Sequence, residues 1–341
     1  MRLLLRAPRA WLGAGRTVDY AAVVCEDGVI VYAGPKAGAP SADREVAVDG
    51  TLMPAAADRH VHIGLSDPLA VLQRGVTAVR DLGWPAERIF PLADLSEMLS
   101  FDGPLIRAAG PILTAPGGYP TRAAWAPEGT GLPVADAEEA AAAVEGLVAR
   151  GATAVKVSLN DDEGPVPGDA VLAAIVDAAH DAELPVTAHA QGEGQVERAL
   201  GAGVDELAHT PWLRLRDDTI RRCAASVRIV STLAIHGLTA DSPALGVALD
   251  NLRRFHAAGG TVIYGTDLGN GPIPPGIVVR ELLLLLEAGL THDEVLTALV
   301  RAPLEPGAPA DLICTAGDPL RSLAAFDELR LVVRGGRVVP A

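Results

Sequence analysis

Two histidines separated by one residue, His60 and His62, are the side chains in this sequence best suited to bind a metal. They close residues 52–62, a segment whose composition is typical of a β-strand. Residues i and i+2 of a strand point to the same face, so both imidazoles could bind one ion while Val61 packs on the opposite side. A solvated strand end could carry the same pair, so this interpretation depends on further ligands downstream.

Lys156 is the next candidate. The chain has 28 lysines and arginines, and only Lys36 and Lys156 are lysines. Residues 152–159 are rich in β-forming residues and are typical of a buried strand. Unlike arginine, a buried lysine can lose its proton, and its neutral amine is then available for reaction. The alternative is a lysine at a strand end whose ammonium group reaches solvent.

Three more potential ligands each close a strand-like run. They are His189 after residues 185–188, His209 after residues 204–208, and Asp267 after residues 261–266. Imidazole and carboxylate are ordinary ligands of zinc and manganese. A lone histidine at a strand end is commonly a hydrogen-bonded structural residue, but four histidines, a lysine and an aspartate at successive strand ends favour a metal site.

The elements that must position these residues repeat along the chain. Helical segments end at a glycine and a short strand follows within a few residues, as in repeated β/α units. Eight parallel strands in roughly 250 residues predict a (β/α)8 TIM barrel, in which active sites lie at the carboxyl ends of the strands. The predicted strands are 52–62, 77–81, 105–109, 152–159, 185–189, 204–209, 228–232 and 261–267.

The order His-x-His, Lys, His, His, Asp resembles the binuclear metal site of the amidohydrolase superfamily. Several phrases are similar to its imidazolonepropionase-like and Xaa-Pro or Xaa-Arg dipeptidase-like branch, and the resemblance covers nearly the whole chain. These phrases are RGVTAVRDLG at 74–83, GTD at 265–267, ADL at 310–312, GDPL at 317–320 and VRGGRV at 333–338.

The resemblance also implies a domain organisation. Residues 54–303 would form the metal-dependent barrel, and residues 1–53 and 304–341 would fold together into one small composite β-sandwich domain. The Asp27-Gly28 pair predicts a hairpin turn within the first of these flanks.

By the same resemblance, six side chains would bind two divalent ions, with zinc as the expected metal. His60, His62 and Asp267 would bind the more buried ion. His189 and His209 would bind the more exposed one.

The resemblance assigns a covalent modification to Lys156. Its amine would react with carbon dioxide, because the resulting carbamate is an anion with two oxygens that can bridge both metals, whereas an ammonium group would repel them. A metal-bridging hydroxide would attack a polarised carbonyl carbon. Asp267 would take the proton and deliver it to the leaving atom, first as general base and then as general acid.

Substrate contacts are less clearly marked. Residues 110–133 form a loop long enough to cover the barrel mouth, and within it Tyr119 stands where relatives often have histidine. Arg122 in this loop could pair with a substrate carboxylate, and His236 could contact substrate or stabilise an oxyanion. The sequence leaves open that each is an ordinary surface residue.

Composition limits the partners. The net charge of −15 argues against nucleic acid and anionic membrane surfaces, and leaves a small-molecule substrate as the expected partner. The three cysteines have no metal-binding or disulfide spacing, which favours a reducing cytoplasm. The apolar run at residues 282–286 is too short to span a membrane. A homo-oligomer is compatible with all of these features.

The leading functional hypothesis is a metal-dependent hydrolase that cleaves the amide C–N bond of a dipeptide, an N-acyl amino acid or a cyclic amide. A lactone or ester hydrolase could use the same site, because the carbonyl chemistry is shared. A mononuclear deaminase is disfavoured, because such relatives usually lack the bridging lysine. A non-catalytic binding protein is disfavoured by the complete set of ligands.

Overall fold

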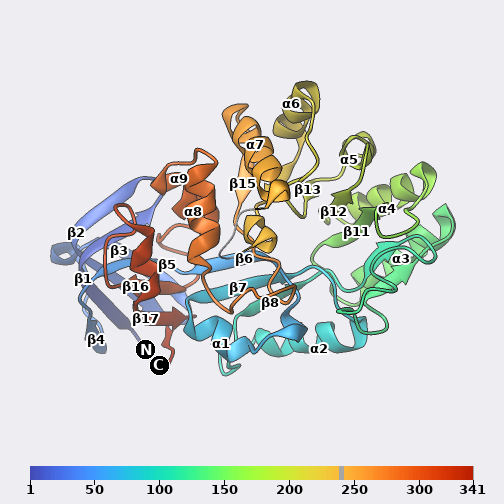
Figure 1. The fold of residues 1–341 in the computed structure, drawn as a ribbon. Helices are drawn as coiled ribbons and strands as arrows, with labels where there is room; N and C mark the ends of the chain where they lie inside the picture. Colours follow the sequence, from blue (N-terminus) through green and yellow to red (C-terminus); the bar gives the residue numbers. More distant parts are fainter. Residues whose placement is uncertain (238–241, 341) are drawn as a thin grey trace.

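Two sheets of parallel strands form the centre of the molecule in the computed structural model, which describes residues 1–237 and 242–340 (Figure 1). The smaller sheet contains β6 (Ala56–Val61), β7 (Val76–Asp81) and β8 (Leu105–Ala108). The larger has the order β10-β9-β11-β12-β13-β14-β15. Its strands are β9 (Ile112–Thr114), β10 (Gly131–Pro133), β11 (Val155–Asn160), β12 (Val186–Gln191), β13 (Glu206–Leu207), β14 (Arg228–Val230) and β15 (Thr261–Ile263). The predicted α/β class with parallel strands is confirmed.

Helices alternate with these strands along the chain and cover them on the outside (Figure 1). Gly75 and Gly151 follow two of the predicted helices at φ values of 89° and 91°, which glycine adopts without strain. Among the described residues, no helix is both long and apolar enough to cross a bilayer. The helices are α1 (Pro68–Gln73), α2 (Ala86–Ser96), α3 (Ala137–Ala149), α4 (Asp169–Asp181), α5 (Gln195–Ala202), α6 (Asp217–Ser226), α7 (Pro243–Ala257), α8 (Val279–Glu287) and α9 (His292–Leu299).

Both ends of the chain meet in a third, mixed sheet of eight strands with the order β18-β17-β16-β5-β1-β2-β3, in which β4 also pairs with β1 (Figure 1). The predicted hairpin joins β2 and β3, with Asp27 and Gly28 at positive φ in its turn. The strands are β1 (Leu3–Gly13), β2 (Arg16–Glu26), β3 (Val29–Pro35), β4 (Arg44–Ala47), β5 (Thr51–Pro54), β16 (Leu312–Thr315), β17 (Leu329–Arg334) and β18 (Arg337–Val338).

The predicted first strand, residues 52–62, is wrong as one element. The chain forms β5 in the terminal sheet, where Pro54 pairs with Leu312, and then begins β6 in the parallel sheet at Ala56. Only Ala55 separates the two strands, so the terminal sheet is attached directly to the strand that carries the first histidines.

Strand ends also differ from the predictions. β14 ends at Val230 and not at Thr232, and β15 ends at Ile263, four residues before Asp267. Thr232 and Asp267 have φ values of 42° and 58°, which no β-strand can include. Hydrophobic patterning cannot detect such left-handed residues, because it reports burial and not backbone conformation.

A buried ion pair joins the two parallel sheets. Arg80 on β7 donates to the carboxylate of Glu206 on β13, which also accepts from Thr187 on β12 at 3.1 Å. The Glu206 side chain is 1% exposed, so this charge depends on its partners.

We expect Glu206→Ala to destabilise the protein by about 3 kcal/mol or more, because it leaves the Arg80 guanidinium buried without its counter-charge. Chemical denaturation would measure this loss. Glu97→Ala is the matched control, since it removes an exposed pair with Arg107 and should cost under about 1 kcal/mol. Equal losses in the two variants would contradict this account.

Glu281 on α8 holds the turn that follows β14. Its carboxylate accepts from the backbone N–H groups of Leu233 at 3.0 Å and Ala234 at 2.6 Å, within a 3-10 turn, Leu233–His236. Burial raises the pKa of Glu281 to about 7, from an ordinary value near 4.5.

This raised pKa predicts how stability depends on pH. The folded state binds the Glu281 proton more tightly than the unfolded state, so the contribution of this group is lost as pH rises from about 4.5 to 7. We expect wild type to lose stability relative to Glu281→Gln across that window, measured as unfolding free energy at several pH values. Exposed Glu145→Gln is the control, and a constant difference would refute the prediction.

Candidate metal centre

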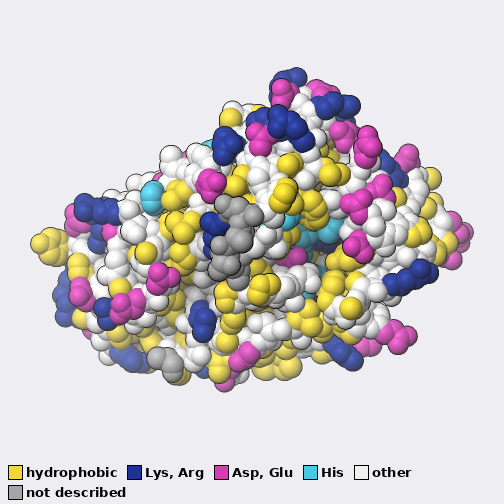
Figure 2. Space-filling model, viewed as in Figure 1, with side chains coloured by type: hydrophobic (Ala, Val, Ile, Leu, Met, Phe, Trp, Pro, Cys, Tyr) yellow, Lys and Arg dark blue, Asp and Glu magenta, His cyan; other side chains and the backbone are white. Residues whose placement is uncertain are grey.

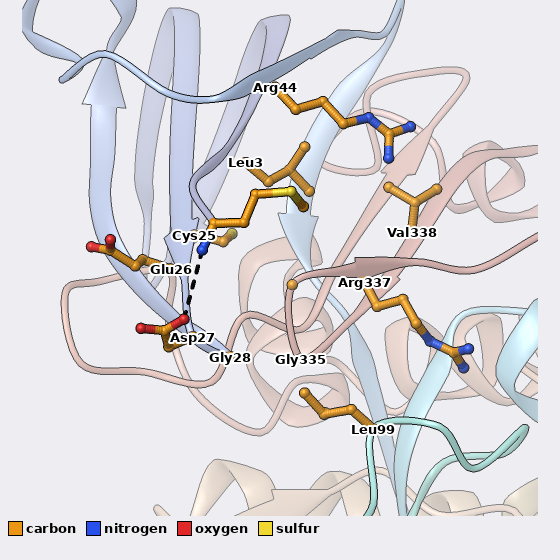
Figure 3. Close-up of a pocket in the computed structure, with 12 residues that line it drawn as sticks. Leu3, Cys25, Glu26, Asp27, Gly28, Arg44, Leu99, Gly335, Arg337 and Val338 are labelled. Carbon is orange, nitrogen blue, oxygen red and sulfur yellow. Dashed lines mark ion pairs between the residues drawn. The ribbon is translucent and has the colours of Figure 1, made fainter.

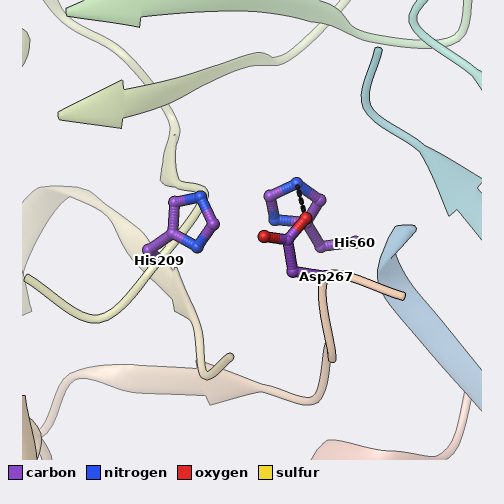
Figure 4. Close-up of side chains that lie close together, drawn as sticks. All are labelled: His60, His209 and Asp267. Carbon is purple, nitrogen blue, oxygen red and sulfur yellow. Dashed lines mark ion pairs between the residues drawn. The ribbon is translucent and has the colours of Figure 1, made fainter. Parts of the chain in front are cut away.

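Three ligand-type side chains meet at the carboxyl side of the parallel strands. Atoms of His60, His209 and Asp267 lie within 4.8 Å of one another, and each residue comes from a different part of the chain (Figure 4). All three residues are buried. Two imidazoles and a carboxylate are a donor set that divalent zinc or manganese can use.

His62 joins this cluster beside His60. The Nε2 atoms of His60 and His62 lie 3.3 Å and 3.2 Å from Oδ1 of Asp267. Their Nδ1 atoms lie 2.9 Å from the carbonyl oxygens of Ala208 and Gly83, respectively. Because a carbonyl only accepts, both Nδ1 atoms donate, and Nε2 is the ring nitrogen of each histidine that faces Asp267.

Asp58 holds this arrangement together, and the sequence analysis missed it. Its carboxylate accepts from the backbone N–H of His60 at 3.0 Å, and from the N–H and the hydroxyl of Thr266 at 3.1 Å and 2.5 Å. It therefore ties β6 to the residue before Asp267. Burial raises the pKa of Asp58 to about 7. The available signal was the two-residue spacing from His60, which places Asp58 on the same side of a strand.

Asp81 stabilises the backbone of the turn that follows His62. It accepts from the backbone N–H groups of Ile63 at 2.7 Å and Gly83 at 3.1 Å, and so fixes the chain after His62. The same turn supplies the Gly83 carbonyl that orients the His62 ring.

His189 and His209 form the other part of the cluster. Their ring centroids are 4.7 Å apart, and the His209 ring is also 4.7 Å from that of His60. Nε2 of His189 is buried with no hydrogen-bond partner among the described residues. Burial lowers the pKa of His189 to about 3 and that of His209 well below its ordinary value, so both rings are neutral, the form that binds metal.

The strand predictions for these two histidines need correction. β12 continues beyond His189 to Gln191, and β13 ends at Leu207, two residues before His209. His209 is held by a contact of 2.9 Å between its Nδ1 and the hydroxyl of Thr232.

Lys156 lies on β11, whose residues are all buried. Strand register places Ser158 beside His189, and Lys156 shares the face of Ser158, so the amine and this imidazole project to the same side. The side chain is 1% exposed, and its Nζ has no partner in the described part of the chain. Burial lowers the pKa of Lys156 to about 7, so a large share of the amine is uncharged near neutral pH.

Asp267 is held in an uncommon conformation. Its φ is 58°, and its backbone N–H donates to the carbonyl of His60 at 2.8 Å. The Asn270 amide donates to both carboxylate oxygens at 3.0 Å and 3.1 Å. Sequence patterning gave no indication of Asn270, whose role depends on this turn.

The three predicted substrate residues lie at different distances from the histidine cluster. Tyr119 lies beside the cluster, with its ring 5.3 Å from that of His189. His236 is one layer further out, 5.1 Å from the Trp212 ring. Arg122 is exposed and forms no ion pair with any residue of 1–237 or 242–340. Trp212 was not predicted, and it contacts both His189 and His209.

A separate cavity of about 450 Å³ lies at the terminal sheet, between the start of β1, the β2–β3 turn and β18 (Figure 3). An ion pair of 3.8 Å between the N-terminal amine and Asp27 lies at its edge. Its one nucleophilic side chain, Cys25, has a pKa raised to about 12 by burial. It holds none of the metal-ligand candidates, so we place the chemistry at the histidine cluster.

The histidine cluster fits divalent metal ions. The pKa values of His60, His189 and His209 are lowered, so these rings are neutral, and Asp267 contacts His60 and His62. Two buried nitrogens, Nζ of Lys156 and Nε2 of His189, have no partner among the described residues. Buried polar atoms are normally paired, so these two atoms are suited to bind metal ions.

The chain is similar to known proteins over most of its length. Residues 51–298 match the model of the Amidohydrolase family. An uncharacterised protein of Mycobacterium tuberculosis is 28% identical over 342 residues, covering 87% of this chain and 88% of its own length.

Solved structures share the fold along the whole chain. A Xaa-Pro dipeptidase with bound methionine in its active site superposes with a TM-score of 0.86 at 20% identity, covering 100% of both chains. The ochratoxinase of A. niger superposes with a TM-score of 0.84 at 21% identity, covering 99% of this chain and 95% of its own.

The family match spans most of the chain and includes all six candidate ligands, His60, His62, Lys156, His189, His209 and Asp267. The site offers the donor set that such enzymes use for divalent metals. The chain belongs to the amidohydrolase family and is a metal-dependent hydrolase.

Proposed function

We propose that this enzyme hydrolyses the amide C–N bond of a small molecule at a binuclear metal site. Water is consumed, and a carboxylic acid and an amine are released. The observation that carries the proposal is the buried amine of Lys156, which has no hydrogen-bond partner in residues 1–237 and 242–340 and lies beside a cluster of imidazoles and one carboxylate. A mononuclear site would have no need of that amine.

The ligands divide by burial into two groups. His60 and His62 are 1% and 2% exposed and both contact Asp267, so we assign these three to the inner ion. His189 and His209 are 8% and 7% exposed and contact each other, so we assign them to the outer ion. The close approach of His209 to His60 supports two adjacent ions in one continuous cluster.

Lys156 would bridge the two groups as a carbamate. Its lowered pKa supplies the neutral amine that reacts with carbon dioxide, and its position on the face of His189 directs it at the cluster. The carbamate anion would also compensate the positive charge of two ions, which a protonated lysine could not do.

Two divalent ions held there, zinc being the expected metal, would supply a deprotonated water near neutral pH and polarise the scissile carbonyl. Asp267 would accept the proton from the attacking water and deliver it to the leaving nitrogen. Asn270 would keep both carboxylate oxygens oriented during this transfer. Lactones and esters present the same carbonyl, so they belong in the same substrate screen.

We also infer that the two parallel sheets close into one eight-stranded barrel over residues 54–303, and that the terminal strands of residues 1–53 and 304–341 form a separate β-sandwich domain. The backbone N–H of Arg59 donates to Tyr264, and that of His62 donates to Leu268 at 2.7 Å, which supports closure between β6 and the chain after β15. The bond from Thr153 to Ala108 supports closure at the other seam.

Removal of the Lys156 amine tests the binuclear site. We expect wild type purified without chelator to hold about two divalent ions per chain, by elemental analysis, and Lys156→Ala to lose metal and activity. Lys156→Arg should also fail, because guanidinium stays charged and cannot form a carbamate. Full activity in the arginine variant, or one ion in a fully active wild type, would overturn the binuclear assignment.

Asp267→Asn separates proton transfer from metal binding. Asparagine retains one oxygen ligand but cannot move a proton, so we expect much of the metal to remain while kcat falls by about 10² to 10⁴. Asp136→Asn, at the N-cap of α3, is the matched control and should leave turnover unchanged. Turnover of Asp267→Asn at the wild-type rate would mean that another group moves the proton, and His236 would be tested next.

A further inference from the structure

We propose that the site takes an uncharged amide with a flat apolar group, such as an aryl amide, and discriminates against substrates that carry a free carboxylate. This inference rests on the proposed amide hydrolysis. It narrows the substrate class from dipeptides, N-acyl amino acids and cyclic amides to neutral amides with a planar substituent.

The first argument is the placement of aromatic rings. Only 4% of the chain is aromatic, yet three aromatic side chains contact the ligand histidines. The Trp125 ring lies 4.5 Å from His62, and the Tyr119 ring lies 5.3 Å from His189. Trp212 contacts His209 at 5.7 Å. Aromatic rings therefore contact three of the four candidate ligand histidines.

These rings lie beside the cluster without being fully buried in the core. Tyr119, Trp125 and Trp212 are each half-buried, so part of each ring faces the open side of the cluster. The indole N–H of Trp125 donates to the Tyr119 hydroxyl at 3.0 Å, which fixes the orientation of both. Rigid aromatic walls around a few polar atoms favour flat apolar ligands.

The second argument is the lack of a counter-charge for a substrate carboxylate. Among the described residues, Lys156 is the one lysine or arginine whose charge acts on His60, His189 and His209, and it would serve the metals. Arg122 is the one basic residue of the loop 110–133, and its side chain is exposed. Residues 238–241, which the structure does not describe, contain no lysine or arginine. A substrate carboxylate that lies away from the metal ions would lose its hydration here without gaining a basic side chain as partner.

The side chains around the cluster also disfavour an anionic substrate. Figure 2 shows histidine side chains in a hollow that is bordered by hydrophobic side chains, with acidic side chains near its rim. The acidic side chains at this rim would repel an anionic substrate and leave a neutral one unaffected.

A set of matched amides tests the inference on the metal-loaded enzyme. Acetanilide with a 4-carboxamide and acetanilide with a 4-carboxylate share the acetanilide bond and have similar size, but they differ in charge. Release of the aniline is the reaction measured, because the carboxamide is a second amide. N-propylacetamide lacks the ring. We expect kcat/KM to be at least about tenfold higher for the carboxamide than for the carboxylate, and higher for the aryl than for the alkyl amide.

Variants connect this preference to the aromatic walls. Trp212→Leu should raise KM severalfold for the aryl amide with a smaller effect on kcat, and should change the alkyl amide little. Tyr20→Leu, an exposed tyrosine on β2, is the matched control and should change neither. Arg122→Gln tests the opposite idea, because an arginine that paired with substrate carboxylates would make this variant selectively slow on the carboxylate.

The outcomes separate the two proposals. Faster hydrolysis of the carboxylate, with loss of that advantage in Arg122→Gln, would overturn the inference and leave amide hydrolysis intact. Failure to hydrolyse any amide would refute the proposed function. In that case tryptophan fluorescence decides the inference, since 4-aminobenzamide should quench it at lower concentration than 4-aminobenzoate, and less in Trp212→Leu. Equal quenching by both would overturn it.

Discussion

The carboxylate of Asp58 is the constraint on which the site depends. It receives three hydrogen bonds, from the backbone of His60 and from the backbone and hydroxyl of Thr266. One side chain thereby fixes the relative position of the first histidine and of Asp267, which are separated by about two hundred residues in sequence. The last strand ends four residues before Asp267, and beyond it the parallel bridge between Val61 and Leu268 acts together with Asp58 to hold this turn.

Burial gives the site its reactivity. Removal from water lowers the pKa of Lys156 and of three histidines, and it leaves two nitrogens without partners among the described residues. His62 differs, because the hydrogen bond and charge of Asp267 outweigh the effect of burial and raise its pKa. An apolar interior would not tolerate these groups unless ions compensated them, so the unfavourable burial is itself the reason that metal binds.

Ionic contacts elsewhere keep the sheets in register around this polar centre. Glu206 connects β13 with β7, and Glu281 connects α8 with the turn after β14. Both carboxylates lie in the interior, and neither touches the ligands. They position the strands and turns from which His209 and His236 project. The aromatic side chains of Trp125 and Trp212 contact histidines of the cluster.

The sequence by itself determined the chemistry and the order of the elements. A paired histidine motif, a rare lysine and ligands that follow successive strands suffice to predict a metal site on parallel β/α units, because side-chain period and helix-stopping glycines are local properties. Only the tertiary structure decided which atoms meet. The division of residues 52–62 between two sheets, the hydrogen bonds of Asp58 and Asn270, and the place of Trp212 beside the histidines depend on contacts between distant segments. The left-handed backbone of Asp267 and the lowered pKa values of the buried lysine and histidines arise from the same packing. No local sequence pattern indicates either of them.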